Sequence, residues 1–304
     1  MSAWSAGIVV VVAAGNTGPS PMSIGVPGNV PYVITVGAVT DNYHPLEPQR
    51  YTLASFSAAG PTYEGFVKPE VVSMGGHLRA YAPDNGTLAV QFPTWVDNTY
   101  RDLTISGTSQ AAAVTSGVVA LMLEANPALR PDDIKCRLMS SARPAVKPNE
   151  TLAYTVFQQG AGLVNANDAV YSTASGCANV GLNVGADLAG LRHFGGRANQ
   201  DENGNFYIME TQPPSGPLGN LLGGLLGGIP ILGDLIVGLA SALDGLLWNG
   251  SYSDPGEFSW SDSYTWGGGY TWSNGYTWSN GYTWSNGYTW SNSAAPGVGP
   301  AGQQ

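Results

Sequence analysis

Two short segments carry side chains that could together cleave an acyl bond, and the first contains Ser109. Residues 105–113 read as a tight glycine turn that leads into a helix, because the apolar residues that follow recur every three or four positions. The unpaired N–H groups and positive dipole end of a helix's first turn favour a developing negative charge. The segment therefore predicts a serine nucleophile beside an oxyanion site. The alternative is that Thr108 or Ser109 only caps the helix.

The second segment, residues 7–16, ends in Asn16. Its β-branched run predicts a strand buried on both faces of a parallel sheet, and such sheets bind ligands at the carboxyl ends of their strands. Asn16 could donate its side-chain N–H to an oxyanion there, which is worth roughly 3–4 kcal/mol of transition-state stabilisation. Alternatively, it could simply begin a turn.

Taken together and in this order, the two segments resemble motifs of the subtilisin-like serine peptidases (subtilases, peptidase S8 family). The nucleophile motif of that family, Gly-Thr-Ser-x-Ala-Ala, matches residues 107–112, and its oxyanion motif, Val-Ala-Ala-Gly-Asn, matches residues 12–16. The resemblance extends over about residues 4–172 and implies a three-layer α/β/α fold with a parallel sheet, of which this chain holds a part. Three further segments match in sequence order: residues 25–38, 55–72 and 160–166.

The resemblance implies hydrolysis of peptide bonds through an acyl-enzyme. Ser109 would be the nucleophile, Asn16 and the Ser109 N–H would hold the oxyanion, and Thr108 would support that site and the bound substrate. The substrates would be proteins or peptides, and small residues in the pocket would leave room for a medium or large apolar side chain before the cut. The implied walls of that pocket are Ala13, Ala14 and Gly15 on one side, and Gly25, Val26 and Pro27 on the other.

One departure from the family pattern concerns the general base. The catalytic Asp and His of the family precede the asparagine segment, but only 15 residues precede Asn16 here. The three histidines, His44, His77 and His193, all lack the family's His-Gly-Thr context. The chain therefore resembles the C-terminal portion of a catalytic domain. We expect it to need a missing N-terminal half as a partner and to be inactive alone.

Composition sets broader limits. The chain has 304 residues, a net charge of −10 and only 11 Lys and Arg, which are scattered, so nucleic acid is not an expected partner. Residues 1–14 lack the positive start of a signal peptide. An acidic, lysine-poor chain is compatible with secretion or a cell-surface location. We expect three regions: a peptidase portion (1–173), a polar and then Leu/Gly-rich linker (174–248) and an aromatic repeat tail (249–304).

Two cysteines raise the question of a disulfide. Cys136 is predicted to point away from the apolar stripe of its helix, and Cys177 is its only available partner. A bridge would close a loop of roughly 40 residues and stabilise the fold by about 4 kcal/mol on the entropic model. Two free thiols are the alternative.

Two surface segments receive weaker predictions. Residues 74–103 contain several aromatic residues and suggest a hairpin or flap beside the nucleophile. Residues 201–205 predict a solvated turn, with a structural calcium loop as the alternative. We expect no cofactor to be required.

The C-terminal third is repetitive. Residues 217–248 form a Leu/Gly tract that favours a flexible or docking segment over a membrane span, because Pro and Asp interrupt it. Residues 264–292 repeat Tyr-Thr-Trp-Ser-Asn-Gly with a period of six. They could form one extended strand, a meander with Asn-Gly turns or a disordered tail. An aromatic surface would suit polysaccharide or cell envelope, so the alternative function is a non-catalytic surface or carbohydrate-binding protein.

Overall fold

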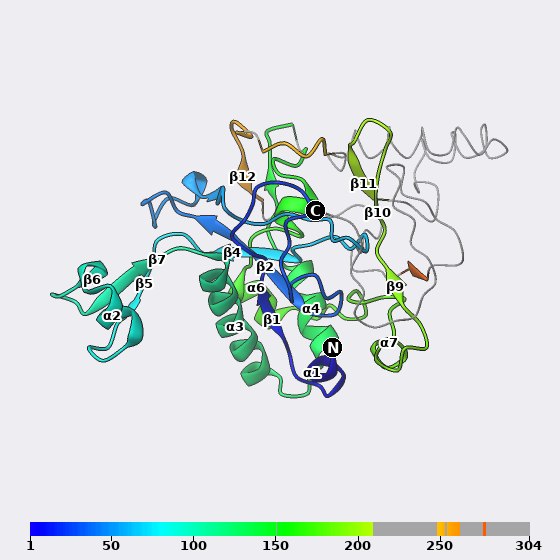
Figure 1. Cartoon of the computed structure of the whole chain (residues 1–304), viewed down its shortest axis with the longest axis horizontal. Coiled ribbons are helices and arrows are strands. Elements are labelled where there is room, and N and C mark those ends of the chain that lie inside the picture. The colour runs from blue at the N-terminus through cyan, green and yellow to red at the C-terminus, as the bar shows by residue number, and fades with distance from the viewer. Residues whose placement is uncertain (150, 209–247, 253, 262–275, 278–304) are drawn as a thin grey trace, which may run out of the picture.

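The computed structural model describes residues 1–149, 151–208, 248–252, 254–261 and 276–277 (Figure 1). The predictions for the Leu/Gly tract before residue 248, and for nearly all of the repeat, lie outside these residues. In chain order the helices and strands are α1 (Ser2–Ser5), β1 (Val11–Ala13), β2 (Ile34–Thr40), η1 (Pro48–Arg50), β3 (Thr52–Leu53), β4 (Val71–Met74), β5 (Leu78–Tyr81), α2 (Thr87–Gln91), η2 (Pro93–Trp95), β6 (Val96–Asp97), β7 (Asp102–Ile105), α3 (Thr108–Ala125), α4 (Pro131–Ser140), β8 (Ala145–Val146), α5 (Val156–Gln159), α6 (Ala166–Tyr171), α7 (Val184–Leu188), β9 (Phe194–Gly195), β10 (Ala198–Gln200), β11 (Phe206–Ile208), β12 (Ser259–Trp260) and β13 (Tyr276–Thr277).

A mixed sheet forms the centre of the domain. Strand β2 pairs in parallel with β1 on one side and with β4 on the other, and the short β3 pairs antiparallel with its end. Because β2 has neighbours on both sides, all of its residues except Thr40 are buried. The predicted α/β class is confirmed, but the sheet carries an antiparallel strand and is not wholly parallel.

Strand β1 differs from its prediction. The sequence suggested a strand buried on both faces, yet Val11, Val12 and Ala13 are only half-buried and Ile8 is exposed. The reason is its position: in the described part of the sheet β1 is an edge strand, with β2 on one side only. A β-branched run reports apolar character, but it does not reveal whether a neighbouring strand is present.

Helix α3 covers the sheet and carries the main core. It packs against β1, β2 and β4, and α6 packs against both α3 and α4 (Figure 1). Buried side chains from these elements, including Val36, Val71, Met122 and Ile134, belong to one apolar cluster. Among the helices that the structure describes, none is long and apolar enough to cross a membrane.

Helix α4 begins at Pro131 and carries the disulfide. Pro131 occupies its first turn, and the Asp133 carboxylate accepts a hydrogen bond from the Arg130 N–H at 3.1 Å. Cys136 is bonded to Cys177 across a separation of 41 residues. The bridge ties α4 to the segment that follows α6, so of the two alternatives for the cysteines the structure contains the disulfide.

Residues 248–252 and 254–261, here called the C-terminal strap, return to the domain. Strand β12 pairs antiparallel with β8. The Tyr252 hydroxyl donates to the Leu53 carbonyl at 3.0 Å, and the Trp260 indole N–H donates to the Tyr51 carbonyl at 3.1 Å. Trp260 also stacks near Tyr154, within a second apolar cluster. The strap therefore covers the β3 end of the sheet with aromatic side chains.

The predicted turn at residues 201–205 is present. The Asp201 carboxylate accepts hydrogen bonds from the backbone N–H groups of Asn203 and Asn205, at 2.9 and 2.8 Å. These bonds close the turn on itself. Across the described residues, no group of three or more His, Cys, Asp or Glu side chains is placed to hold a metal ion.

A buried ionic cluster lies beneath the start of β2. The side chains of Lys68, Glu70 and Lys135 are 1%, 2% and 0% exposed. Glu70 Oε1 lies 2.5 Å from the Lys68 ammonium and 2.8 Å from that of Lys135, and its Oε2 accepts from the Thr35 N–H. The cluster thus places two cations against one anion in the protein interior.

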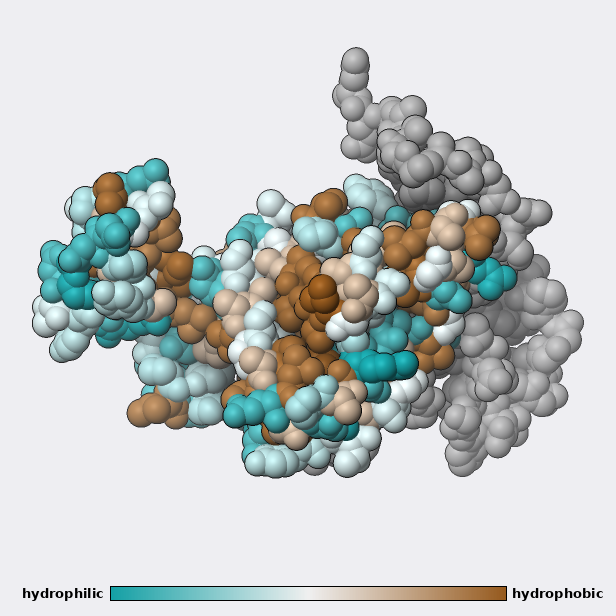
Figure 2. All heavy atoms as spheres, turned by 90° about the horizontal axis from the view of Figure 1, so that it is seen from below, coloured by the Kyte–Doolittle hydropathy of each residue, from teal (hydrophilic) through white to brown (hydrophobic). Residues whose placement is uncertain are grey.

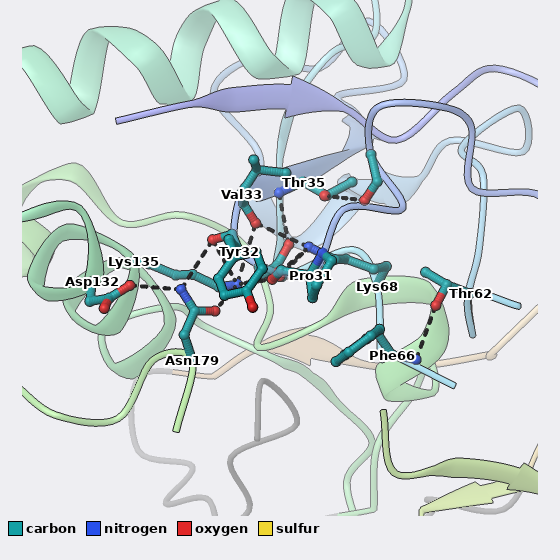
Figure 3. A network of polar contacts seen from close by, with 12 residues as sticks. Pro31, Tyr32, Val33, Thr35, Thr62, Phe66, Lys68, Asp132, Lys135 and Asn179 are labelled. Carbon is teal, nitrogen blue, oxygen red and sulfur yellow. Dashed lines mark hydrogen bonds and ion pairs between the residues drawn. The ribbon is translucent and has the colours of Figure 1, made fainter. Parts of the chain in front are cut away.

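Main-chain carbonyls complete this cluster. Both ammonium groups point toward residues 31–33 (Figure 3): Lys68 donates to the Val33 carbonyl at 3.0 Å, and Lys135 donates to the Pro31 carbonyl at 2.8 Å. Asn179 accepts from Lys135 at 2.9 Å. Burial lowers the pKa of Lys68 to about 7, against the opposing attraction of Glu70.

Candidate active site

The candidate site lies where the carboxyl end of β1 meets the start of α3. Gly107 precedes the helix, and its N–H donates to the Gly75 carbonyl in the turn after β4, at 2.8 Å. The two backbones lie so close that a Cβ on Gly75 would fall 2.7 Å from the Gly107 oxygen. Glycine is therefore required at position 75, and the turn after β4 fixes the position of the helix start.

Thr108 joins the helix to β1. It is fully buried, and its hydroxyl donates to Asn16 Oδ1 at 2.9 Å while accepting from the Gly15 N–H at 3.1 Å. The Thr108 backbone N–H donates to the same Asn16 oxygen at 2.8 Å. Because two donors hold Oδ1, the side-chain NH₂ of Asn16 is left to face away from Thr108.

Ser109 is the next residue and lies exposed at the second position of α3. Its backbone N–H belongs to the first turn, whose N–H groups have no partner within the helix. A Cβ added to Gly107 would lie 3.4 Å from Asn16 Nδ2, so the Asn16 amide packs against the Gly107 backbone. The site therefore combines an accessible hydroxyl with an oriented amide and helix N–H groups that can stabilise a developing negative charge.

The two segments predicted to wall a substrate pocket lie side by side. The Gly25 N–H donates to the Ala14 carbonyl at 2.9 Å. A Cβ on Gly15 would approach the Gly25 nitrogen to 3.5 Å, so residues 13–15 and 25–27 adjoin. Ala14 is buried in this contact, whereas Val26 and Pro27 are exposed. Their part in binding a substrate remains a prediction.

All three histidines have their ring contacts elsewhere. His44 pairs with Glu47, and His193 lies near Asp187 and Glu64. The His77 ring lies 3.2 Å from the Thr40 hydroxyl, 3.4 Å from Asp41 Oδ1, and is stacked on Tyr43. In the part of the chain that the structure describes, none of the three rings hydrogen-bonds to Ser109.

Sequence reasoning missed the supports behind the helix start. The Gly75 carbonyl holds Gly107, and the Ser106 hydroxyl accepts from the His77 N–H at 2.9 Å. The available signal was the Gly75–Gly76 pair, because glycine permits a close approach of two backbones. The partner of that approach is distant in sequence and could not be named.

The comparisons with known proteins match the N-terminal part of the chain. The profile of the subtilase family (Peptidase_S8) matches residues 1–176. Serine protease AprX of Bacillus subtilis (strain 168) is 40% identical over 169 residues, which are 55% of this chain and 36% of that protein. Subtilisin DY of Bacillus licheniformis is 34% identical over 165 residues, 54% of this chain and 47% of that protein.

A solved structure gives a weaker likeness. The crystal structure of fervidolysin from Fervidobacterium pennivorans, described as a keratinolytic enzyme related to subtilisin, is 26% identical. Its TM-score is 0.41, and the match covers 56% of this chain and 23% of that one. The chain spans less than half of the length of each of these relatives. The family profile covers more than half of this chain, and it does so across both Asn16 and Ser109. The chain belongs to the subtilase family, the subtilisin-like serine peptidases.

Proposed function

We propose that this chain supplies the nucleophile and the oxyanion site of a serine endopeptidase. Ser109 attacks the scissile carbonyl, and the Asn16 side-chain NH₂ and the Ser109 N–H receive the oxyanion. The observation that carries this proposal is the double acceptor role of Asn16 Oδ1, which turns the amide nitrogen outward beside an exposed serine. Residues 13–15 and 25–27 form the pocket for the side chain before the cut.

The proposal needs a histidine and its carboxylate from another segment, in the same protein or on a second chain. An apolar surface beside β1 is suited to receive it. An open cavity of about 600 Å³ lies between residues 7–11 and α3, and the helix lines it with Ser116, Val119, Ala120 and Leu123. Ile8, which lines this cavity, is 58% exposed. A complementing segment that pairs with the open edge of β1 would cover this surface and stand close to Ser109.

The test is a chimera. The part of Serine protease AprX that precedes the matched region is fused before Met1, and labelling by a fluorophosphonate is compared with that of the unfused chain. We expect rapid labelling of the chimera, on Ser109 alone, and labelling slower by a factor on the order of 10⁴ in the unfused chain. When the chimera hydrolyses a peptide substrate, Asn16→Ala should lower kcat roughly 10²–10³-fold and leave KM little changed.

Two results would contradict the proposal. A folded chimera that is not labelled would remove Ser109 from the role of nucleophile. Rapid labelling that persists in the Ser109→Ala chimera would place the reactive group elsewhere. The Ser140→Ala chimera is the matched control, because Ser140 is an exposed helical serine that does not line the cavity beside β1 and should be dispensable.

The location and the tail complete the proposal. We place the protein outside the cell or at its surface, because a disulfide persists in oxidising compartments. Residues 262–304 would attach it to polysaccharide or cell envelope through their aromatic repeats, while the C-terminal strap stays with the domain.

A further inference from the structure

The feature that the proposed site does not use is a projecting lobe, residues 78–105, here called the arm. It contains β5, α2, η2, β6 and β7, and it stands away from the body of the domain (Figures 1 and 2). Its sheet has the order β5-β7-β6. Ala82, Val96 and Leu103 form a small core of its own, separate from the main cluster. The arm is therefore a self-contained unit added between β4 and α3.

The arm is rooted beside the candidate nucleophile. Leu78 pairs with Ile105 at its base, and Ile105 is four residues before Ser109. Four residues of extended chain span at most about 14 Å. The base of the arm thus lies within about 14 Å of Ser109, and β5 and β7 extend it by roughly another 10 Å.

The order of the central sheet sets the side on which the arm lies. Strands β1 and β4 flank β2 and run parallel to it, so their carboxyl ends share one edge of the sheet. The predicted pocket follows β1, whereas the arm follows β4. A peptide lying along this edge would pass the pocket, then Ser109 and then the arm. If the pocket takes the residue before the cut, the arm faces the residues after it.

The exposed surface of the arm is aromatic, and its charges are largely paired. Tyr81, Tyr100 and Trp95 are 75%, 69% and 54% exposed. Arg79 pairs with Asp102 at 2.6 Å and lies over the Tyr100 ring, with Cζ 5.5 Å from its centre. Exposed rings outside the small core are typical of a surface that meets apolar side chains.

Strand β5 adds a backbone feature that suits the same ligand. Within the described residues it pairs only with β7, which leaves its outer edge open. An open edge binds an extended peptide through main-chain hydrogen bonds, while side-chain contacts supply the preference. Both features fit an extended polypeptide with apolar residues.

We propose that the arm binds the leaving-group side of the polypeptide substrate, preferring aromatic or large apolar residues about five to seven positions after the cut. This rests on the proposed function, because the position of the cut is defined by Ser109. At about 3.4 Å per residue, the fifth to seventh residues lie about 17–24 Å beyond the cut, which matches the reach of β5 and β7.

The test measures binding, so it does not depend on turnover. The full chain carrying Ser109→Ala is titrated with fluorescein-labelled peptides of Ser and Gly that contain one Phe, and affinity is read from anisotropy. One peptide carries Trp at the fifth and seventh positions after the Phe, one carries Trp at the same distances before it, and one has no Trp. We expect the first to bind at least tenfold more tightly than the other two.

The arm variant is Tyr81→Ser with Tyr100→Ser. It should reduce the preference for the first peptide to less than twofold, whereas Tyr171→Ser, which alters an equally exposed tyrosine on α6, should keep it. An unchanged preference in the arm variant would overturn the proposal. Equal binding of Trp before and after the Phe would also overturn it, because the arm would then be an unspecific apolar surface. Failure of the fluorophosphonate test alone would remove the catalytic role but leave this preference to be measured.

Discussion

The buried cluster of two lysines and one glutamate makes an asymmetric prediction about stability. Removing Lys68 leaves one cation facing one anion, whereas removing the charge of Glu70 leaves two ammonium groups without an anion. Breaking a buried ion pair by removing one partner typically costs about 3–5 kcal/mol, because a buried charge is left uncompensated. We therefore expect Glu70→Gln to lower the free energy of unfolding by about 3–5 kcal/mol, and Lys68→Met to lower it by less than about 2 kcal/mol at pH 6.

The pH dependence follows from the pKa of Lys68, which burial lowers from its usual 10.5 to about 7. Between pH 7 and 10.5 the unfolded chain keeps this proton and the folded chain releases it, so the unfolded state binds more protons. The Lys68 contribution therefore raises stability as the pH increases through this window, and it is constant below pH 7. The full effect is at most roughly 4–5 kcal/mol at 1.36 kcal/mol per pKa unit.

The assay is urea denaturation of the full chain at half-unit steps from pH 6 to 9.5, with the free energy extrapolated to zero urea. The parent curve minus the Lys68→Met curve isolates the contribution of Lys68. It should rise with pH by 1 kcal/mol or more. A flat or falling difference would refute the assignment of a depressed pKa. If Lys68→Met and Glu70→Gln lowered the free energy of unfolding equally, the argument that two buried cations share one anion would be refuted.

Three further predictions concern single contacts. In the active chimera, Thr108→Val should lower kcat tenfold or more and stability by about 1–3 kcal/mol, since it leaves the partly buried Gly15 N–H without its acceptor. Thr108→Ser should stay within twofold in kcat, and equal loss in both variants would refute the role of the hydroxyl. Reducing the Cys136–Cys177 bridge should lower the free energy of unfolding by about 4 kcal/mol; a melting temperature unchanged by reductant would contradict this. Trp260→Ala should release the C-terminal strap and speed limited proteolysis near residues 254–261, and cleavage at the parental rate would show that the Trp260 contacts do not hold it.

The sequence predicted which two segments meet more closely than it predicted the sheet. Asn16, Thr108 and Ser109 are brought together as expected, because a strand end and a helix start are local features that glycines and β-branched runs mark well. The burial of β1 was overestimated, since burial depends on whether a second strand lies alongside. The flap expected at residues 74–103 is present as the arm, but its length and its sheet depend on pairings between β5 and β7, which are more than twenty residues apart.

The charge cluster shows a different limit of sequence reasoning. Lys68 and Glu70 are two residues apart in an extended segment, so they share a face, and that much could be read from the sequence. Nothing local indicates that this face is interior, because lysine and glutamate usually lie at the surface. Burial follows only when α4 brings Lys135 to the same carboxylate and residues 31–33 present their carbonyls. Those of Pro31 and Val33 accept from both ammonium groups, and that of Tyr32 accepts from Lys135. Each buried charge is stabilised by the opposite charge and the carbonyls beside it, which come from distant segments. The cluster therefore forms only when these segments pack together. A substitution at Glu70 should therefore disturb the start of β2 and α4 together, although the two are about one hundred residues apart in the chain.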